Sequence, residues 1–354
     1  MERLFKYYII VIATTILLCS LSACCKNKRS SQPSEIGYSL HLEFDTELPT
    51  WQTIPLSSTR ASLDDSPDNY DVRYIIRAYQ CDVHGKLTDR IADAEWKVIS
   101  DDISSLDTST TIHLEQGMWR ILVWADYVTH GSSADLYYNT NDFEAIRLQG
   151  NHVGSNNFRD AFCGEATIDV GTTAKVNAPY QDITIAMSRP LAKIQFIATD
   201  FGDFTTFLAE LKAEQAATSN EEDGIKYVST EDIDKYRAIV RYVSNMPSEY
   251  DMLKMRPSDI SVNTEFESHI KPLSENEAEL AFDYIFVEDE GAVNIIVEII
   301  DEQDNVVARS SRIKVPYIHS HLTIVRGQFM TSTATGGVGI MPEFNGDWNY
   351  PVVY

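Results

Sequence analysis

The chain is poor in cysteine and in positive charge. Its 354 residues contain only five cysteines, and only Cys81 and Cys163 lie beyond residue 25. Two cysteines cannot build the framework of a disulfide-stapled domain, although an oxidising compartment would permit one bond between them. The 29 basic residues face 53 acidic ones, for a net charge of −24. Charge of this sign disfavours nucleic acid and anionic membrane surfaces as partners.

Short catalytic motifs are also missing. The sequence has no Gly-x-Ser-x-Gly, no phosphate-binding loop and no His-Glu-x-x-His. His319 and His321 share a face of an expected strand without a third ligand at a suitable spacing, so we expect no metal site. Gly336–Gly339 lacks the flanking strand and helix of a dinucleotide loop, so no cofactor is expected. These absences favour a non-catalytic protein. A glycan hydrolase is the least favoured alternative: its two catalytic carboxylates come together in the fold and not in the sequence, so a missing motif does not exclude it.

Two further features leave a binding role open. The acidic clusters Glu221–Asp223 and Asp301–Asp304 carry the oxygens that calcium prefers, although solvated turns explain them equally well. Trp51, Tyr137 and Tyr138 would stack on sugars if they were exposed, but most aromatic residues belong to a core or an edge.

The amino terminus has the pattern of a secretory signal. Glu2, Arg3 and Lys6 precede the apolar run Tyr7–Leu18. This run is shorter than the roughly 20 residues that cross a bilayer, so it indicates a signal peptide and not a membrane span.

The signal ends in a sequence that resembles the bacterial lipobox, Leu21-Ser22-Ala23 before Cys24. In that motif the cysteine is acylated and the chain is cut directly before it. Each buried CH₂ contributes about 0.8 kcal/mol, so several acyl chains make a durable anchor. The alternative is an ordinary secretory signal with an incidental cysteine. We expect residues 1–23 to be removed and the mature chain to hang from a membrane by Cys24, with residues 24–36 as a polar tether.

Short strand-like runs dominate the sequence from Gly37 onward and predict an all-β chain. Met118–Val128 is apolar on both faces, which predicts a strand buried on both sides. Residues 129–182 are expected to hold loops and short edges. The other expected strands are Tyr38–Phe44, Asp71–Asp82, Thr110–Leu114, two runs within Asp182–Thr199, Tyr236–Val243, and a meander of Leu280–Val287, Val293–Ile300 and Val306–Val315.

One helix and one domain boundary are expected in the middle of the chain. Ser188-Arg189-Pro190 interrupts two strand-like runs, since proline cannot sit inside a central strand. We therefore predict two β-sandwich domains, residues 37–187 and 188–354. Phe204–Ala217 is the helical insertion, with Asp203 as N-cap; its apolar face is expected to contain Phe204, Phe207, Leu208 and Leu211.

Several segments together resemble the fimbrillin-type subunits and anchors of Bacteroidales type V pili, including their lipoprotein members. The resemblance implies two tandem transthyretin-like β-sandwich domains and a lipoprotein that travels to the outer membrane. It also implies a structural or adhesive role in a cell-surface fimbrium. The matching segments are Val72–Tyr79, Trp119–Tyr127, Met187–Ile194, Leu280–Val287, His321–Phe329 and Gly337–Tyr350.

The resemblance further implies other fimbrial subunits as partners, joined by strand addition. In polymerising members a protease cuts after an arginine in the first domain, and Arg60, within Ser57–Ala61, is the matching position here. A loop arginine that is never cut is the equal alternative, since the helical insertion departs from the fibre-forming pattern and anchor members need no cut. Gly336–Tyr354 is either a donor segment or the last strand of its own domain.

These observations favour a lipid-anchored fimbrial subunit, anchor or accessory protein. The runner-up is a surface lipoprotein that binds glycan or host protein on the same scaffold. The basic start Lys26–Arg29 does not resemble the acidic surface-export signal of related lipoproteins, so a periplasm-facing location also stays open.

The first testable prediction concerns Cys24. Replacement by alanine (Cys24→Ala) should leave an unprocessed precursor without lipid, because the acceptor thiol is gone. Radiolabelled palmitate followed by gel electrophoresis measures both outcomes. Label on the variant at the mature size would show that the lipobox interpretation is wrong.

Overall fold

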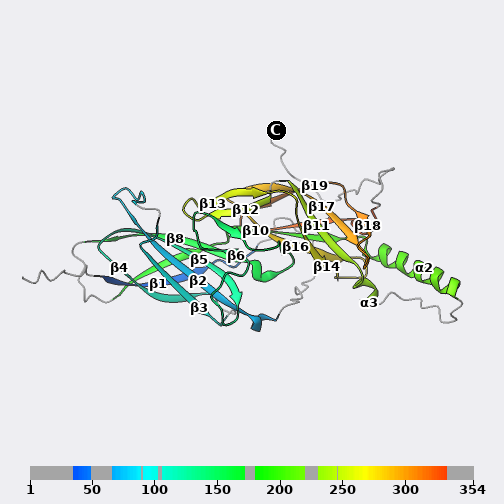
Figure 1. Ribbon diagram of the computed structural model, residues 1–354, viewed down its shortest axis with the longest axis horizontal. Coiled ribbons are helices and arrows are strands. Elements are labelled where there is room, and N and C mark those ends of the chain that lie inside the picture. Colours follow the sequence, from blue (N-terminus) through cyan, green and yellow to red (C-terminus); the bar gives the residue numbers. More distant parts are fainter. Residues whose placement is uncertain are drawn as a thin grey trace, which may run out of the picture.

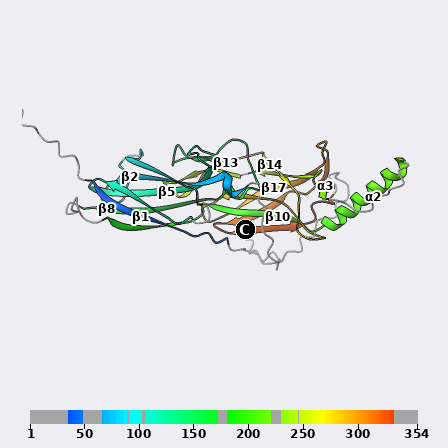
Figure 2. The same cartoon turned by 90° about the horizontal axis from the view of Figure 1, so that it is seen from below.

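The computed structural model describes residues 35–48, 66–88, 91–102, 106–171, 180–219, 230–244 and 246–332. Strands make up most of this part of the chain, so the all-β prediction is confirmed. The molecule is elongated, with the strands of residues 36–187 (the first half) at one end and most strands of residues 191–327 (the second half) at the other (Figures 1 and 2). Within the described residues, no helix is both long and apolar enough to span a membrane.

The first half is a sandwich of two sheets. One sheet has the order β4-β1-β9, with β1 and β9 parallel, and the other has the order β3-β2-β5-β8. Side chains of both sheets, among them Leu40, Tyr74 and Ile121, form a buried core between them. The strands are β1 (Ile36–Phe44), β2 (Tyr70–Cys81), β3 (Ala94–Ser100), β4 (Thr108–Leu114), β5 (Gly117–Thr129), β8 (Ala161–Val170) and β9 (Gln181–Met187).

The second half repeats this arrangement. Its sheets have the orders β15-β16-β10-β20 and β14-β11-β17-β18, and β19 also pairs with β17. Phe196, Val240 and Ile295 lie in the core between them. The strands are β10 (Leu191–Ala198), β11 (Arg237–Ser244), β14 (Thr264–His269), β15 (Lys271–Pro272), β16 (Ala278–Phe286), β17 (Glu290–Ile300), β18 (Val306–Arg309), β19 (Ile313–Ile318) and β20 (Leu322–Gly327).

A fifth sheet contains strands from both halves. Its order is β13-β12-β7-β6, in which β6 (Tyr138–Asn139) and β7 (Ile146–Leu148) come from the first half, and β12 (Met246–Asp251) and β13 (Arg256–Ser261) from the second. Two short helical turns, η2 (Pro67–Asn69) and η3 (Asn157–Arg159), also belong to the first half. The division into domains at residue 188 therefore remains a prediction, since strands from both sides of it share one sheet.

A third core fills the space between the two sandwiches. Along β5, Ile121 and Val123 point into the core of the first half, whereas Leu122 and Trp124 point into this third core. On β16, Phe282, Tyr284 and Phe286 point into it from the second half. The prediction that β5 is buried on both faces is thus confirmed, and the reason is that each face serves a different core.

Aromatic rings from both halves meet in the third core. The ring of Tyr138 lies edge-on to Trp124 with centroids 5.4 Å apart, and 5.7 Å from the ring of Phe286. Tyr250, on β12, stacks on Phe286 with ring centroids 5.5 Å apart. Offset and edge-on aromatic pairs contribute about 0.5–1.5 kcal/mol each beyond the area they bury.

The predicted meander is wrong in two places. β16 pairs with β10 and does not pair with β17, because residues 287–289 carry the chain from one sheet of the sandwich to the other. The run Val306–Val315 forms two strands, β18 and β19. Between them the Ser310 hydroxyl accepts a hydrogen bond from the Val297 backbone N–H at 2.9 Å, and this interrupts the ladder.

Two further predictions from the sequence need correction. Residues 129–182 contain β8, a ten-residue strand of the first half, and not only loops and short edges. The helix α2 spans Phe201–Ser219 and is followed by the short α3 (Thr230–Ile233). Asp203 therefore lies in the first turn and is not the N-cap.

The apolar face of α2 is only partly buried. Phe204 and Leu208 pack into the core of the second half, but Phe207 is 50% exposed and Leu211 36% exposed. The helix projects from the far end of the second half, away from the first (Figures 1 and 2). At its start, Asp200 does not cap the helix with its carboxylate, which accepts backbone hydrogen bonds from residues 329–331 at 2.8–3.2 Å.

The second prediction tests whether the third core couples the two halves. Phe286→Ala should lower the free energy of unfolding by about 3–5 kcal/mol, because it leaves a cavity between rings that the surroundings cannot close. Urea denaturation followed by fluorescence measures this loss, with Phe207→Ala as the half-exposed control. If the halves are coupled, the variant still unfolds in one transition; separate transitions in the wild-type protein would contradict the coupling.

Candidate functional site at the junction of the two halves

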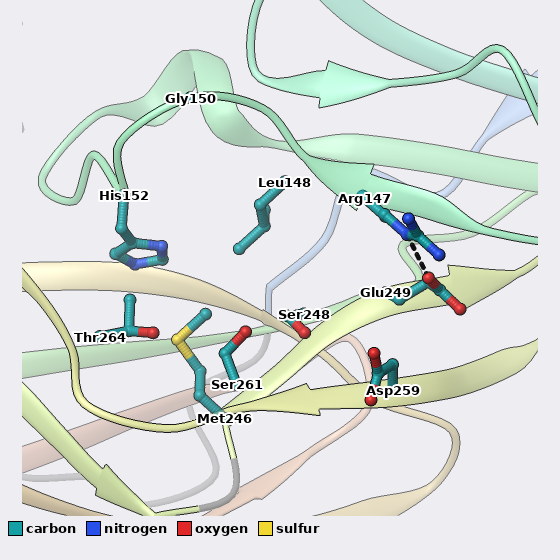
Figure 3. A pocket seen from close by; sticks show the side chains of 10 residues that line it. All are labelled: Arg147, Leu148, Gly150, His152, Met246, Ser248, Glu249, Asp259, Ser261 and Thr264. Atoms are coloured by element: carbon teal, nitrogen blue, oxygen red, sulfur yellow. Dashed lines mark hydrogen bonds and ion pairs between the residues drawn. The ribbon is translucent and has the colours of Figure 1, made fainter.

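A polar pocket lies where the fifth sheet meets the second sandwich (Figure 3). It has a volume of about 390 Å³ and is open to solvent. β7 and the loop after it form one wall, and β12, β13 and the start of β14 form the other. The lining residues are Arg147, Leu148, Gly150, His152, Met246, Ser248, Glu249, Asp259, Ser261 and Thr264.

An ion pair closes one end of the pocket. Arg147 on β7 and Glu249 on β12 are register partners, and the Arg147 Nε donates to Glu249 Oε2 (Figure 3). The Ser258 hydroxyl donates to the other carboxylate oxygen at 2.6 Å. Hydrogen bonding to Glu249 raises the pKa of Arg147 above its usual value. The pair thus fixes the register between a strand of the first half and a strand of the second.

His152 stands at the opposite end of the pocket (Figure 3). Its side chain is 4% exposed, and its Nε2 lies 2.7 Å from Asp283 Oδ2. The rings of Phe266 and Tyr242 have centroids 5.5 and 5.9 Å from the imidazole. The His152 Nδ1 is buried and has no hydrogen-bond partner among the described residues. The Asp283 contact therefore holds this ring from one side only.

Asp283 is the centre of a buried polar cluster behind the pocket. Its carboxylate is completely buried and accepts hydrogen bonds from His152, from Arg159 Nη1 and from the Tyr242 hydroxyl, the last at 2.6 Å. Burial alone would raise the pKa of Asp283, but the Arg159 charge and the His152 contact outweigh it and lower this pKa to about 2. The carboxylate is therefore charged in the folded protein at all ordinary pH values.

The loop between β7 and β8 binds the second half at further points. The Ser155 backbone N–H donates to the Phe282 carbonyl at 2.7 Å, and its hydroxyl lies 2.6 Å from the Ser268 hydroxyl. Arg120, on β5, donates to the Leu253 carbonyl at 2.9 Å. Together with the third core, these contacts make the junction a continuous interface and not a flexible link.

Arg189, in the predicted break, occupies the point where the chain crosses between halves. Its Nε donates to both oxygens of Asp160, at 2.9 and 2.8 Å. Its terminal nitrogens donate to the carbonyls of Thr46 and Glu47 at 2.9 and 2.8 Å. The break at Ser188–Pro190 is therefore held by a buried guanidinium, and the crossing segment is not a linker.

The pocket presents groups that can bind a polar ligand. The hydroxyl groups of Ser248, Ser261 and Thr264 and the Asp259 carboxylate offer hydrogen bonds to a polar ligand. The described part of the pocket contains no hydrogen bond between a hydroxyl and the His152 ring, which faces Asp283 instead. Among the described residues, no group of three or more histidine, cysteine or acidic side chains is arranged to hold a metal ion.

Most site residues predicted from the sequence lie outside the described residues. These are Cys24, the lipobox residues Leu21–Ala23, Arg60, Trp51 and the C-terminal segment Gly336–Tyr354. Lipidation at Cys24, cleavage after Arg60 and strand donation therefore remain predictions.

The candidate disulfide between Cys81 and Cys163 is not formed, since both thiols are free and buried. Cys81 is the register partner of Met118, and Cys163 that of Trp124, on opposite sides of β5. Six residues of strand correspond to about 20 Å. A disulfide needs Cα atoms about 4.4–6.8 Å apart, so the geometry excludes this bond.

Two binding hypotheses from the sequence are tested only in part, because Trp51 and the acidic cluster Glu221–Asp223 lie outside the described residues. Tyr138 is 1% exposed and packs in the third core, so it cannot stack on a sugar. The Asp301 carboxylate accepts hydrogen bonds from the backbone N–H groups of Gln303 and Asn305 within its own turn. Asp304 pairs with Arg237, so these turn carboxylates already have partners.

The buried ionic residues were not predicted. A signal for them exists, because Arg73, Asp126 and Asp283 interrupt apolar runs that were predicted to be strands, one of them, Met118–Val128, buried on both faces. A charge inside such a run must find a partner when it is buried. Arg73 and Asp126 are indeed register partners on β2 and β5, with Nη2 and Oδ2 2.7 Å apart.

Comparison with known families gives one match to the sequence. Residues 33–353 match a family described as a family of unknown function, DUF6562. No curated protein matches the chain.

Solved structures provide more distant similarities. A candidate adhesin from Bacteroides ovatus gives a TM-score of 0.42 at 11% identity, covering 86% of this chain and 90% of that one. A candidate polysaccharide-binding protein (DUF1812) from Bacteroides thetaiotaomicron gives 0.41 at 8% identity, covering 77% and 79%. The fimbrial anchor protein Mfa2 from Porphyromonas gingivalis gives 0.38 at 10% identity, covering 77% and 82%. Similarity at this level assigns no role to the chain or to any of its residues.

The third prediction follows from the lowered pKa of Asp283. Its folded-state value of about 2 lies below the usual 3.8, so the charged carboxylate stabilises the fold above about pH 4. This contribution, about 2 kcal/mol, is lost as the pH falls from about 4 to about 2. Asp283→Asn should lower the free energy of unfolding by about 3–5 kcal/mol at neutral pH, because it leaves Arg159 buried without its counter-charge.

Denaturation as a function of pH measures both effects. The difference in the free energy of unfolding between wild type and Asp283→Asn should narrow between pH 4 and pH 2. The control Asp182→Asn, at a side chain 76% exposed, should change the free energy of unfolding little at any pH. A constant difference across this range would mean that Asp283 does not carry the acid sensitivity.

Proposed function

The chain belongs to the family of unknown function DUF6562, and we propose that it is a lipid-anchored, non-catalytic component of a surface fimbrium: a subunit, an anchor or an accessory protein. The observation that carries the proposal is the junction, which joins two sandwiches into one elongated body behind a lipobox-like amino terminus. The sequence resemblance to fimbrillin-type proteins supports the same role.

The junction suits a protein that transmits force. A load applied between the two ends meets the third core, the β7–β12 strand pairing and the buried ion pairs together. These contacts must break together before the halves separate. A protein that only displays a binding loop does not need such a junction, whereas an anchor or shaft component does.

The charge distribution suits an anchored body that stands away from lipid. The tether, residues 24–36, is basic, while the whole chain carries a net charge of −24. Anionic lipid repels such a body, so contact with the membrane is expected only through the acyl chains at Cys24 and the short tether. The outer membrane is the location proposed.

Strand addition requires an open sheet edge, and β4 is the best candidate among the described residues. It is an end strand that pairs only with β1 in this part of the chain. It has regular register over seven residues and contains neither proline nor a lysine or acidic side chain. By contrast, the edge strand β13 carries Pro257 and two register shifts, features that protect an edge from pairing.

The alternative function is that of a surface glycan- or host-protein-binding lipoprotein. The observation that favours it is the open polar pocket between His152 and the Arg147–Glu249 pair, which offers several hydroxyl groups and a carboxylate. Such a protein would retain its ligand without any fimbrial subunit.

The fourth prediction tests strand addition at β4. The tagged full-length protein should co-purify with fimbrial subunits from detergent-solubilised envelopes. Ser109→Lys with Thr111→Lys, at two exposed β4 positions, should lose them, because lysine side chains on an edge strand protect it from pairing with another strand, and each 1.4 kcal/mol of lost binding energy lowers the affinity tenfold.

The matched control is Thr129→Lys with Gln303→Lys, which makes the same charge change at exposed positions outside β4. Loss of partners in both double variants would point to a charge effect without strand addition. If wild-type protein captures no fimbrial subunit but is retained on glycan arrays, the alternative function is correct.

A further inference from the structure

Lys193 and Asn157 bring a primary amine and a side-chain amide into direct contact across the junction. Lys193 lies on β10 in the second half, and Asn157 begins η3 in the first. The Lys193 Nζ donates to Asn157 Oδ1 at 2.8 Å. The lysine nitrogen donates hydrogens, so its hydrogen-bond partner is the carbonyl oxygen of the amide and not the amide NH₂ group. The nucleophilic nitrogen thus faces the carbonyl end of the amide.

The surroundings of the amine are aromatic. The Lys193 Nζ lies 4.0 Å from the ring centroid of Phe282 and 5.0 Å from that of Tyr284. Burial among these groups lowers the pKa of Lys193 to about 8, although the Asp160 and Glu279 charges act in the opposite direction. At that pKa roughly a tenth of the amine is neutral at pH 7, far more than for a lysine in water.

The amide carbonyl has a second donor. The Tyr284 hydroxyl lies 3.5 Å from Asn157 Oδ1. Burial raises the pKa of Tyr284 well above its usual value, so its hydroxyl keeps its proton and can donate. A donor at this oxygen stabilises the negative charge that develops there when a nucleophile adds to the carbonyl carbon.

The backbone holds both groups in place. Asn157 is fixed by its turn, where its carbonyl accepts from the Asp160 N–H at 3.2 Å. Lys193 is fixed by hydrogen-bonded pairing of β10 with β16 on one side and β20 on the other. Two reacting groups held at contact distance gain a large effective concentration over free groups in solution.

We propose that Lys193 and Asn157 form an intramolecular isopeptide bond that covalently joins the two halves. The neutral Lys193 Nζ adds to the Asn157 carbonyl carbon, and its electron pair forms the new C–N bond. The bond from this carbon to the original amide nitrogen breaks, and that nitrogen leaves as ammonia with a proton shed by Nζ. No oxidant, reductant or other reactant is needed.

Asp160 is the carboxylate that we assign to carry this proton. It ends the same turn that Asn157 begins, and its charge acts on Lys193. Its side chain is anchored by Arg189, so its position is fixed relative to the turn. This inference does not rest on the proposed function, although a covalent joint beside the third core would strengthen any load-bearing body.

Peptide mapping of the full-length protein, purified from envelopes, tests the proposal. Trypsin should cut after Arg147 and Arg159, after Lys175 and after Lys212, but not after a modified Lys193. The expected product joins residues 148–159 to residues 176–212, with a mass lower than the sum of the two by one ammonia molecule. Fragmentation should place the link at Lys193 and Asn157.

Three variants complete the experiment. Lys193→Arg keeps the positive charge and removes the nucleophile, and Asn157→Ala removes the electrophile, so both should abolish the joined peptide. Asn151→Ala changes an exposed asparagine of the same tryptic peptide and should keep it. The wild-type readout does not depend on how well any variant folds.

Two results would overturn the proposal. The first is wild-type protein that yields residues 148–159 and a peptide ending at Lys193 as separate species. The second is loss of ammonia confined to residues 148–159 alone, which would indicate cyclisation of an asparagine and not a cross-link.

Discussion

A buried carboxylate on β16 constrains how the two halves meet. Asp283 is fully buried, and the groups that hold it come from both sides of the junction: Arg159 and His152 from the first half, Tyr242 from the second. A charge removed from water without partners is very costly, so this carboxylate is tolerated only when both halves are folded and docked. The contact selects one relative placement of the sandwiches, which apolar packing alone would leave free to slide.

The same constraint organises the loop between β7 and β8. His152 and Arg159 are both tied to Asp283, and Ser155 is tied to the β16 backbone between them. A segment without strands is thereby fixed to β16 at three points. His152 in this loop lines the pocket. Asn157 in the same loop accepts the hydrogen bond from Lys193. Both features therefore depend on the docking of the halves.

The sequence predicts the strands well and their partners poorly. Alternation in residues 38–44 and the two-faced run at 118–128 reflect local burial, and both became strands. Whether consecutive strands pair or cross between sheets depends on short connections such as residues 287–289, whose composition permits either. The contacts of the junction were not predicted for a related reason: Lys193 and Asn157 lie far from their partners in the sequence, and neither has a neighbourhood that distinguishes it. The charged residues inside apolar runs were the one usable signal.

The scarcity of positive charge limits how the protein can meet a partner. Ten arginines of the described residues lie in ion pairs, several of them inside the molecule; they are Arg73, Arg77, Arg120, Arg147, Arg159, Arg189, Arg237, Arg241, Arg309 and Arg326. Acidic residues outnumber basic ones by 53 to 29, so carboxylates without a basic partner remain in excess after these pairs have formed.

Such a surface repels other acidic proteins at long range, so association with them must come from short-range contacts. Backbone hydrogen bonds along an open strand are of that kind, since they do not depend on net charge. The strand β4, with serine, threonine and histidine as its exposed side chains, is an edge where an acidic partner would meet little repulsion.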